Sequence, residues 1–266
     1  MIGITLAYLA VGALAGLVAG MLGLGGGVVI VPALALVFPL LGIPPAVLMH
    51  LAIGTSLAVI VPTSMSSTWA HYKRGAVDGA LLRLLLPGLV PGALLGGWLA
   101  DKLPSALLAR IFGVFVIGVA TQIFFNATAP GRRPLPGKTG LLATGSVIGT
   151  ASTLLGIGGG SLTVPFLNYC RVDMRRAVAT SSACGLVLGV LGAAAFLWNG
   201  RGHTGLPPGA VGYLYLPAFA GLALAAVSTA PLGARLAHSL PVPTLKRVFA
   251  AFLALAGLRM LGVLSF

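Results

Sequence analysis

Acidic residues are nearly missing from this chain, which has three aspartates and no glutamate among its 266 residues. Charged residues of both signs make up only 7% of the sequence, whereas a soluble domain carries roughly a quarter. Hydrophobic residues make up 58%, and the mean hydropathy is +1.07. Even a large soluble globule keeps much of its surface in water. This composition therefore excludes a soluble globular protein and indicates an integral membrane protein.

Cysteine is scarce as well, and Cys170 and Cys184 both lie in or beside apolar stretches. Two cysteines provide neither a disulfide framework nor a metal-ligand cluster, so we expect small buried side chains and no metal or cofactor. Residues 1–22 are apolar but lack the basic start of a secretory signal. A cleaved signal peptide is therefore not expected.

Sixteen lysines and arginines against three acids give a net charge of +13. This charge would suit nucleic acid if it formed one basic face, but the basic residues stand in small groups between apolar stretches. Lysine and arginine near the ends of membrane spans set the orientation of a protein in the bilayer. We therefore expect membrane lipids around the chain and no nucleic-acid partner.

The sequence contains two copies of one unit. The segment GLGGG at 23–27 recurs as GIGGG at 156–160, and Val-Pro follows each at the same spacing. Residues 95–115 align without gaps on residues 232–252, with ten of the 21 pairs identical. Chance similarity between apolar helices would not keep glycine, proline and arginine in order, so the repeat is real.

This repeat divides the chain into a first transmembrane repeat (1–126), a cytoplasmic connector rich in proline and glycine (127–138) and a second transmembrane repeat (139–266). Each repeat contains about five apolar segments. They cover roughly 4–22, 28–41, 48–70, 79–100 and 106–126, and then 139–155, 161–170, 177–198, 209–230 and 243–264. A span needs about 20 apolar residues, so the second segment of each repeat is predicted to be a part-length or broken helix.

An odd number of crossings in each repeat makes the two repeats insert upside down relative to each other. With the N-terminus outside, eleven of the sixteen basic residues fall in cytoplasmic loops and two in outside loops. Arg83, Arg110 and Arg259 lie in or at the ends of helices. The bias predicts that both termini lie outside. The expected fold class is all-α: a polytopic transmembrane protein of two inverted-topology repeats, whose glycine-broken short helices meet at mid-membrane.

The glycine clusters are the first candidate site: Gly25, Gly26, Gly27, Gly158, Gly159 and Gly160. A dinucleotide fingerprint would need a preceding strand and a following acid, and neither is present. Consecutive glycines can break a helix and restart it, which leaves backbone N–H groups unpaired. Within a membrane such groups must face protein or a water-filled cavity, and a helix N-terminus favours anions. The alternative is that these glycines only permit close helix packing.

Other polar side chains complete the predicted substrate site: Thr55, Ser56, Thr180, Ser181, Ser182, Asn168 and Arg83. The hydroxyls, expected to open the long helix after each broken segment, either bind an oxyanion or bond to their own helix carbonyls. Asn168 either lines the cavity or caps its helix. Arg83 either reaches the cavity or extends to the interface, and the sequence leaves open whether His50 is a proton relay.

The three aspartates are predicted to lie in loops, which leaves the spans without a carboxylate. A cation or proton carrier would normally need one there, so the expected substrate is a small anion. An intramembrane enzyme should show an acid–base pair or a metal-ligand cluster, and neither is visible, so the chain is not expected to be an enzyme.

The chain is similar to the TauE/SafE family of sulfite exporters in an ordered set of motifs. These motifs are G-x-G-G-G-x3-V-P at 23–32 and 156–165, Thr-Ser at 55–56 and 180–181, HYKRGAVD at 71–78 and PLGARLAH at 231–238, followed by LKRVF at 245–249. The resemblance covers nearly the whole chain. It implies a transporter of sulfite or a small organosulfur anion in the cytoplasmic membrane of a prokaryote.

We expect alternating access around a central anion site, with each repeat gating one side. An inside-negative potential favours anion exit by about 2.3 kcal/mol per charge per 100 mV, so export needs no coupling ion. The alternatives are a transporter of another small anion such as a carboxylate or sulfonate, by uptake as well, and a structural membrane subunit without activity. The sequence leaves open whether the chain forms a homo-oligomer.

Overall fold

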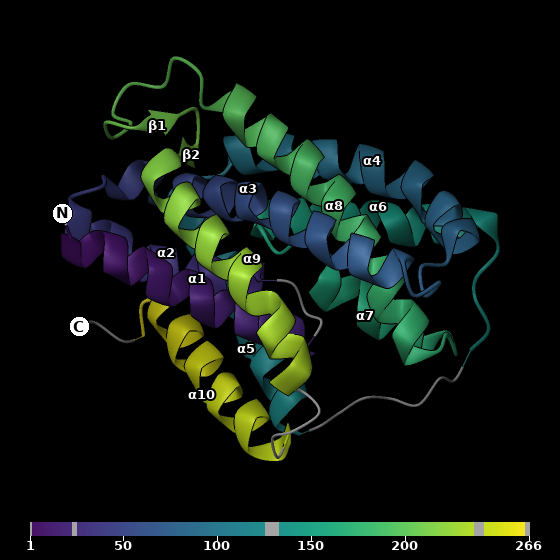
Figure 1. Cartoon of the computed structure of the whole chain (residues 1–266). Helices are drawn as coiled ribbons and strands as arrows, with labels where there is room; N and C mark the ends of the chain where they lie inside the picture. Colours follow the sequence, from purple (N-terminus) through teal and green to yellow (C-terminus); the bar gives the residue numbers. More distant parts are fainter. Residues whose placement is uncertain (1, 23–25, 126–132, 237–241, 264–266) are drawn as a thin grey trace.

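The computed structural model describes residues 2–22, 26–125, 133–236 and 242–263. These residues form ten α-helices, one short 3-10 helix and one β-hairpin (Figure 1). The first five helices are α1 (Ile2–Leu22), α2 (Gly27–Val37), α3 (Pro45–Tyr72), α4 (Gly79–Lys102) and α5 (Ser105–Phe124). The others are α6 (Lys138–Leu155), α7 (Gly160–Tyr169), α8 (Met174–Asn199), α9 (Leu216–Leu236) and α10 (Val242–Met260).

The predicted all-α membrane architecture is confirmed. Within the described residues, four helices are long and apolar enough to cross a membrane: α3, α4, α5 and α8. The second segment of each repeat is short, as predicted, since α2 has 11 residues and α7 has 10. Each of these two helices contains one proline, and α2 continues into the 3-10 helix Phe38–Leu41.

Three differences from the sequence prediction bear on the later argument. Helices α3 and α8 begin at Pro45 and Met174, so Thr55 and Thr180 lie inside these helices and do not open them. The predicted segment 209–230 begins as a β-hairpin, in which β1 (Ala210–Val211) pairs with β2 (Leu214–Tyr215), and the helix follows. Asp101 lies in the last turn of α4 and not in a loop.

Two helix pairs run in the same direction and contain glycine at the contact. Gly12 and Gly16 of α1 lie against Leu222 and Ala226 of α9. On α4, Gly88, Gly92 and Gly96 follow one face and lie successively against Leu142, Ser146 and Thr150 of α6. Small residues four apart let two backbones approach closely, which is how helices associate in membranes, where apolar surface alone gives little driving force.

Two other pairs are antiparallel. On α3 and α8, Gly54 contacts Phe196 and, farther along, the hydroxyls of Ser67 and Ser182 are 3.1 Å apart. Helices α5 and α10 pair through Gly113 and Gly257. Helix α3 is buried from Leu51 to Ile60 without interruption and forms the centre of the molecule.

The bundle has two ends, which we name by what they contain. The hairpin end contains the β-hairpin together with the start of α3 and the end of α4. The connector end is named after the segment that leads into α6, where Leu135 lies beside Asp78. It contains the start of α4 and the start of α8, joined by a hydrogen bond from the Asp78 N–H to Oγ1 of Thr180. Asp78 and Asp173 cap the N-termini of α4 and α8 with their carboxylates.

The α5–α10 pair packs unequally on the two halves of the chain. It lies mainly against α3, with smaller contacts to α2 and α6, and it does not pack comparably on α7 or α8 (Figure 1). The burial of the short helices differs in the same way. Every residue from Gly27 to Leu34 of α2 is buried, whereas α7 is half-buried at four of its ten positions.

Candidate functional site

The two glycine clusters contact each other. Gly27, the first residue of α2, lies with its Cα against the Gly156 carbonyl and the Cα of Ile157, so closely that no side chain would fit. Gly26 is the N-cap of α2, and its carbonyl accepts hydrogen bonds from Val29 and Ile30 at 3.0 Å each. Gly25 lies outside the described residues. This contact brings the start of α2 against the segment that leads into α7.

The second cluster breaks the chain between α6 and α7. Gly156, Gly158 and Gly159 have φ angles of +69°, +64° and +80°, a conformation that only glycine adopts at low cost. Gly159 is the N-cap of α7, and its carbonyl accepts hydrogen bonds from Leu162 and Thr163. Within the described residues, no backbone carbonyl accepts a hydrogen bond from the N–H groups of Gly158, Gly159 and Gly160. The N-terminus of α7 therefore presents donors without a backbone partner.

Two buried hydroxyls flank these donors. A Cβ placed on Gly159 would lie 3.5 Å from Oγ1 of Thr163 and 3.7 Å from Oγ of Ser152. Both side chains are completely buried, and neither hydroxyl has a hydrogen-bond partner in the described part of the chain. An unpaired buried hydroxyl costs free energy, so this concentration of donors indicates a binding site for an acceptor.

We call the N-terminus of α7 together with Ser152 and Thr163 the buried polar centre, and the residues that surround it are uncharged. The atoms nearest to Gly158 and Gly159 belong to Ile60, Leu188, Thr163 and Ser152, and the Gly158 carbonyl lies against Gly185. Thr153, also completely buried, turns its methyl group to Gly192, and its hydroxyl has no partner among the described residues. The centre can therefore offer a ligand hydrogen bonds from hydroxyls and backbone N–H groups and a helix dipole, in apolar surroundings.

Thr55 and Thr180 anchor other helices. Oγ1 of Thr55 accepts a hydrogen bond of 3.0 Å from the Tyr215 N–H, just before α9. Oγ1 of Thr180 accepts one of 3.2 Å from the Asp78 N–H, just before α4. These two threonines occupy equivalent positions in the repeat, and they lie at opposite ends of the bundle. A substrate role for either stays a prediction.

The remaining predicted hydroxyls differ in their surroundings. Ser56 donates a hydrogen bond of 2.8 Å to the Gly156 carbonyl and so joins α3 to the second cluster. Ser182 donates to the Val178 carbonyl of its own helix at 3.0 Å. Ser181 is 2% exposed, and its hydroxyl has no partner among the described residues. Ser56 and Ser181 are the predicted hydroxyls whose environment fits a buried polar centre.

Asn168 and Arg83 lie away from the centre. Asn168 is half-buried near the end of α7, where its backbone carbonyl accepts a hydrogen bond from the Arg171 N–H. Arg83 is exposed in the second turn of α4, near the connector end. This position lets the guanidinium extend to the membrane surface.

Ser152, Thr153 and Thr163 are not predicted from the sequence. A glycine cluster is visible in sequence, but one serine or threonine in an apolar helix has no distinguishing pattern. Ser152 and Thr153 end α6 immediately before the cluster, and Thr163 follows it by one turn of α7. Their position within about one helical turn of the glycine cluster is the signal in the sequence that points to them.

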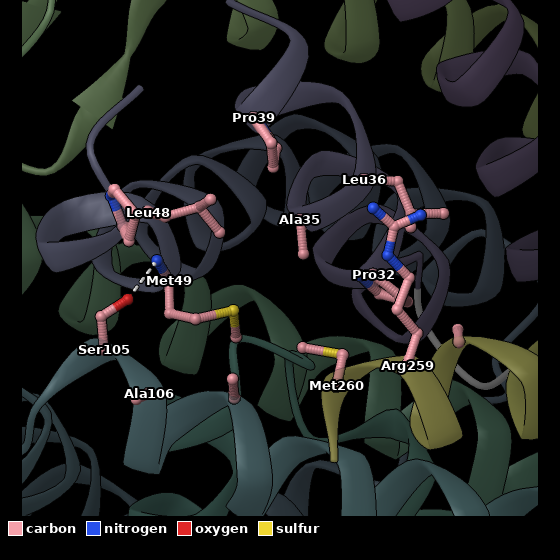
Figure 2. Close-up of a pocket in the computed structure, with 13 residues that line it drawn as sticks. Pro32, Ala35, Leu36, Pro39, Leu48, Met49, Ser105, Ala106, Arg259 and Met260 are labelled. Atoms are coloured by element: carbon pink, nitrogen blue, oxygen red, sulfur yellow. Dashed lines mark hydrogen bonds between the residues drawn. The ribbon is translucent and has the colours of Figure 1, made fainter. Parts of the chain in front are cut away.

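Two pockets in the described residues lie apart from this centre. One, of about 280 Å³, is mostly apolar and lies between α2, α3, α5 and α10, with Arg259 beside Pro32 and Leu36 (Figure 2). The other, of about 390 Å³, lies at the connector end beside Asp78, Arg171 and Asp173. Neither is lined by a predicted site residue. We place the candidate site at the buried polar centre because its buried hydroxyls have no partner in the described part of the chain.

The helices define a multi-pass membrane protein with a buried polar centre, and comparison with known proteins identifies its class as membrane transporters. Residues 8–260 match the family described as "Sulfite exporter TauE/SafE", and the chain belongs to this family. A probable membrane transporter protein of Haemophilus influenzae is 37% identical over 95% of this chain and 96% of its own. One of Methanocaldococcus jannaschii is 27% identical over 94% of this chain and 93% of its own. No solved structure matches the chain.

Proposed function

We propose that this transporter exports sulfite or a small organosulfur anion from the cytoplasm by alternating access. The observation that carries the proposal is the buried centre around Gly159, where the hydroxyls of Ser152 and Thr163 have no partner among the described residues and the N–H groups of residues 158–160 have no backbone acceptor there. A small oxyanion has several acceptor oxygens and matches such a set, whereas a cation would need carboxylates or carbonyl oxygens. The family's description names sulfite.

The polarity of the site supports an anion in a second way. The described aspartates all lie at helix ends, two as N-caps and Asp101 in the last turn of α4. A carboxylate near the centre would repel an anion in surroundings of low dielectric constant. Neutral donors and helix N-termini stabilise a bound anion and still let it leave, since no fixed positive charge holds it.

Alternating access is supported by how the helices pair. If the repeats have inverted topology, α1–α9 and α6–α4 are equivalent pairs, and α3–α8 and α5–α10 each cross the symmetry axis. The observed pairs are these, parallel in the first case and antiparallel in the second. The hydrogen bonds of Thr55 to the start of α9 and of Thr180 to the start of α4 are equivalent in the same sense.

Orientation follows from the basic residues. The connector end contains most of them, among them Lys73, Arg74, Arg175 and Arg176, so we place it in the cytoplasm. The hairpin end and both termini then lie outside. The membrane potential drives an anion from the connector end to the hairpin end without a coupling ion, which favours export.

The test is anion flux through purified protein in liposomes, with sulfite, small sulfonates and small carboxylates compared. We expect sulfite or a sulfonate to move, faster when the compartment facing the connector end is negative. Transport of carboxylates alone would contradict the organosulfur substrate. Movement of no anion by the purified protein would contradict the transport proposal and favour a structural subunit.

Two variants test the site itself. Thr163→Val keeps the shape of the side chain and removes its donor, and Ser152→Ala removes the other. Since one lost hydrogen bond to a charged group costs about 1.5–3 kcal/mol, we expect the substrate's KM to rise roughly tenfold or more for each. The control is Thr121→Val, because Thr121 is exposed on α5 and bonds only within its own helix. Unchanged transport by both site variants would show that the site lies elsewhere.

A further inference from the structure

His50 is a buried histidine under the β-hairpin, and the transport mechanism above does not use it. It lies in the second turn of α3 and is 5% exposed. Its Nε2 is 3.0 Å from the Ala100 carbonyl oxygen. Because a carbonyl only accepts, Nε2 bears a hydrogen. Nδ1 is buried and has no hydrogen-bond partner in the described part of the chain.

The hairpin covers His50 with an aromatic ring. Tyr213, which is 4% exposed, lies over the imidazole with the ring centres 4.9 Å apart and the planes inclined by 30°. Its other ring neighbours are His203 and Phe196, at 5.7 and 6.3 Å. The Tyr213 N–H donates to the Phe196 carbonyl at 3.1 Å. Gly54 of α3 lies directly against the Tyr213 carbonyl, so the hairpin is closely seated on α3.

This cover is present at one end of the bundle only. The hairpin segment, residues 200–215, joins α8 to α9, whereas the equivalent link between α3 and α4 is the short segment 73–78. Through the Tyr215 N–H, the hairpin segment also holds the hydroxyl of Thr55, which lies one turn beyond His50 on α3. The second repeat has therefore acquired an element that closes the hairpin end over α3.

Few charged or titratable groups face His50. Asp101 at the end of α4 is near enough to interact electrostatically with both His50 and Tyr213, and it pairs with Lys102 at 3.4 Å. His203 is exposed in the hairpin segment. Arg259 of α10 lines the apolar pocket on the Met49 side. Burial, and then Asp101, raise the pKa of Tyr213, so this phenol is neutral at physiological pH.

We infer that His50 is the proton-binding residue of a gate formed by the hairpin segment, an inference that rests on the proposed transport function. A second proton would place an N–H and a positive charge at Nδ1, which has no hydrogen-bond partner in the described structure; besides Ala100, the groups near enough to favour a charged ring are Asp101 and the Leu103 backbone. A buried charge without a partner is costly, so the protonated ring requires water or Asp101, and Tyr213 must move away to admit either. Protonation therefore favours the open gate, and moving Tyr213 also frees Thr55.

The first test is the pH dependence of flux. On acidification of the hairpin side from about pH 7.5 to about pH 5.5, we expect flux to rise at least threefold, within a limit of about tenfold per pH unit for one proton. His50→Gln should abolish this rise, because a glutamine amide can still donate to Ala100 but does not titrate. His203→Gln is the matched control and should retain it. Equal acid activation in His50→Gln would overturn the inference.

The second test needs no transport. Leu214 of the hairpin is 8% exposed and Val211 is 46% exposed. We expect maleimide to label Leu214→Cys faster, relative to Val211→Cys, at the lower pH, and to lose this change when His50→Gln is added. The Val211→Cys rate corrects for the pH dependence of thiol chemistry, and the native cysteines are buried. An unchanged ratio would overturn the gate, whereas a changing ratio without any anion flux would refute only the proposed function.

Discussion

Gly159 is the residue on which the proposed site depends most directly. Its φ of +80° needs glycine, and a Cβ placed on it would lie 3.5 Å from Oγ1 of Thr163 and 3.7 Å from Oγ of Ser152. A methyl group there would also lie 2.6 Å from Cδ1 of Leu188. Substitution therefore has two separable effects, backbone strain and obstruction of the donors.

We predict that Gly159→Ala lowers stability by about 1–2 kcal/mol through strain alone and abolishes transport. The control is Gly42→Ala, because Gly42 has a similar φ of +70° and no atom within 4 Å of the added methyl group. It should lose comparable stability and transport normally. Thermal unfolding and flux of both purified variants measure the two effects. Normal flux in a folded Gly159→Ala protein would remove this residue from the site.

At the residue scale, the glycine clusters of the candidate site could be predicted from the sequence, but the hydroxyl groups beside them could not. The clusters are predicted because runs of glycine are rare in helices, and their contact at Gly27 and Gly156 is observed. The hydroxyls of Ser152 and Thr163 matter only through three-dimensional proximity to Gly159, which no spacing in the sequence encodes. Thr55 and Thr180 were selected by their repetition, which reflects their equal anchoring of α9 and α4.

Among the elements, the parallel pair α4–α6 shows why glycine is so abundant. Gly88, Gly92 and Gly96 lie against the backbone of α6, and Oγ1 of Thr150 donates to the Gly92 carbonyl at 3.1 Å. With lipid as the solvent, packing and such hydrogen bonds hold the helices together. Loss of the glycine face should therefore separate the pair.

We predict that Gly92→Leu costs about 2 kcal/mol or more, since overpacking at a close contact displaces a backbone. Gly118→Leu on α5 is the matched control, because nothing lies within 4 Å of its added Cβ. Gly118→Leu should keep the melting temperature in detergent within a few degrees, whereas Gly92→Leu should lower it strongly or prevent folding. Equal melting temperatures would contradict this account of the α4–α6 contact.

Helices were predictable from apolar length, and each of the ten predicted segments corresponds to a helix. The errors have local causes. Helices α3 and α8 start earlier than predicted, because their first turns include Pro45 and the arginines after Asp173, which are less apolar than the span. The hairpin was missed because residues 210–215 are as apolar as α9, and the turn depends on Gly212 with a φ of +55°.

For the whole molecule, the unequal packing of α5–α10 has a mechanistic consequence. This pair lies against α2 and α3 and not comparably against α7 and α8 in the described structure. If the repeats are inverted, the opposite arrangement has similar contacts and is a second accessible state. Exchange between two such packings would alternate access at the two ends, since packed interfaces switch between discrete states and do not deform continuously.

We therefore predict that fixing α5 to α3 stops transport. Leu48 and Ala106 face the pocket between these helices and are accessible at least in part (Figure 2). A short cross-linker that attaches to thiols through disulfides, applied to Leu48→Cys/Ala106→Cys, should reduce flux at least about tenfold, because one side then stays closed, and reduction of the disulfides should restore it. The single-cysteine variants, treated with the same reagent, should transport normally. Undiminished flux in the fully cross-linked protein would mean that α5 stays on α3 throughout the cycle, and the movement would then have to lie within α7 and the hairpin segment.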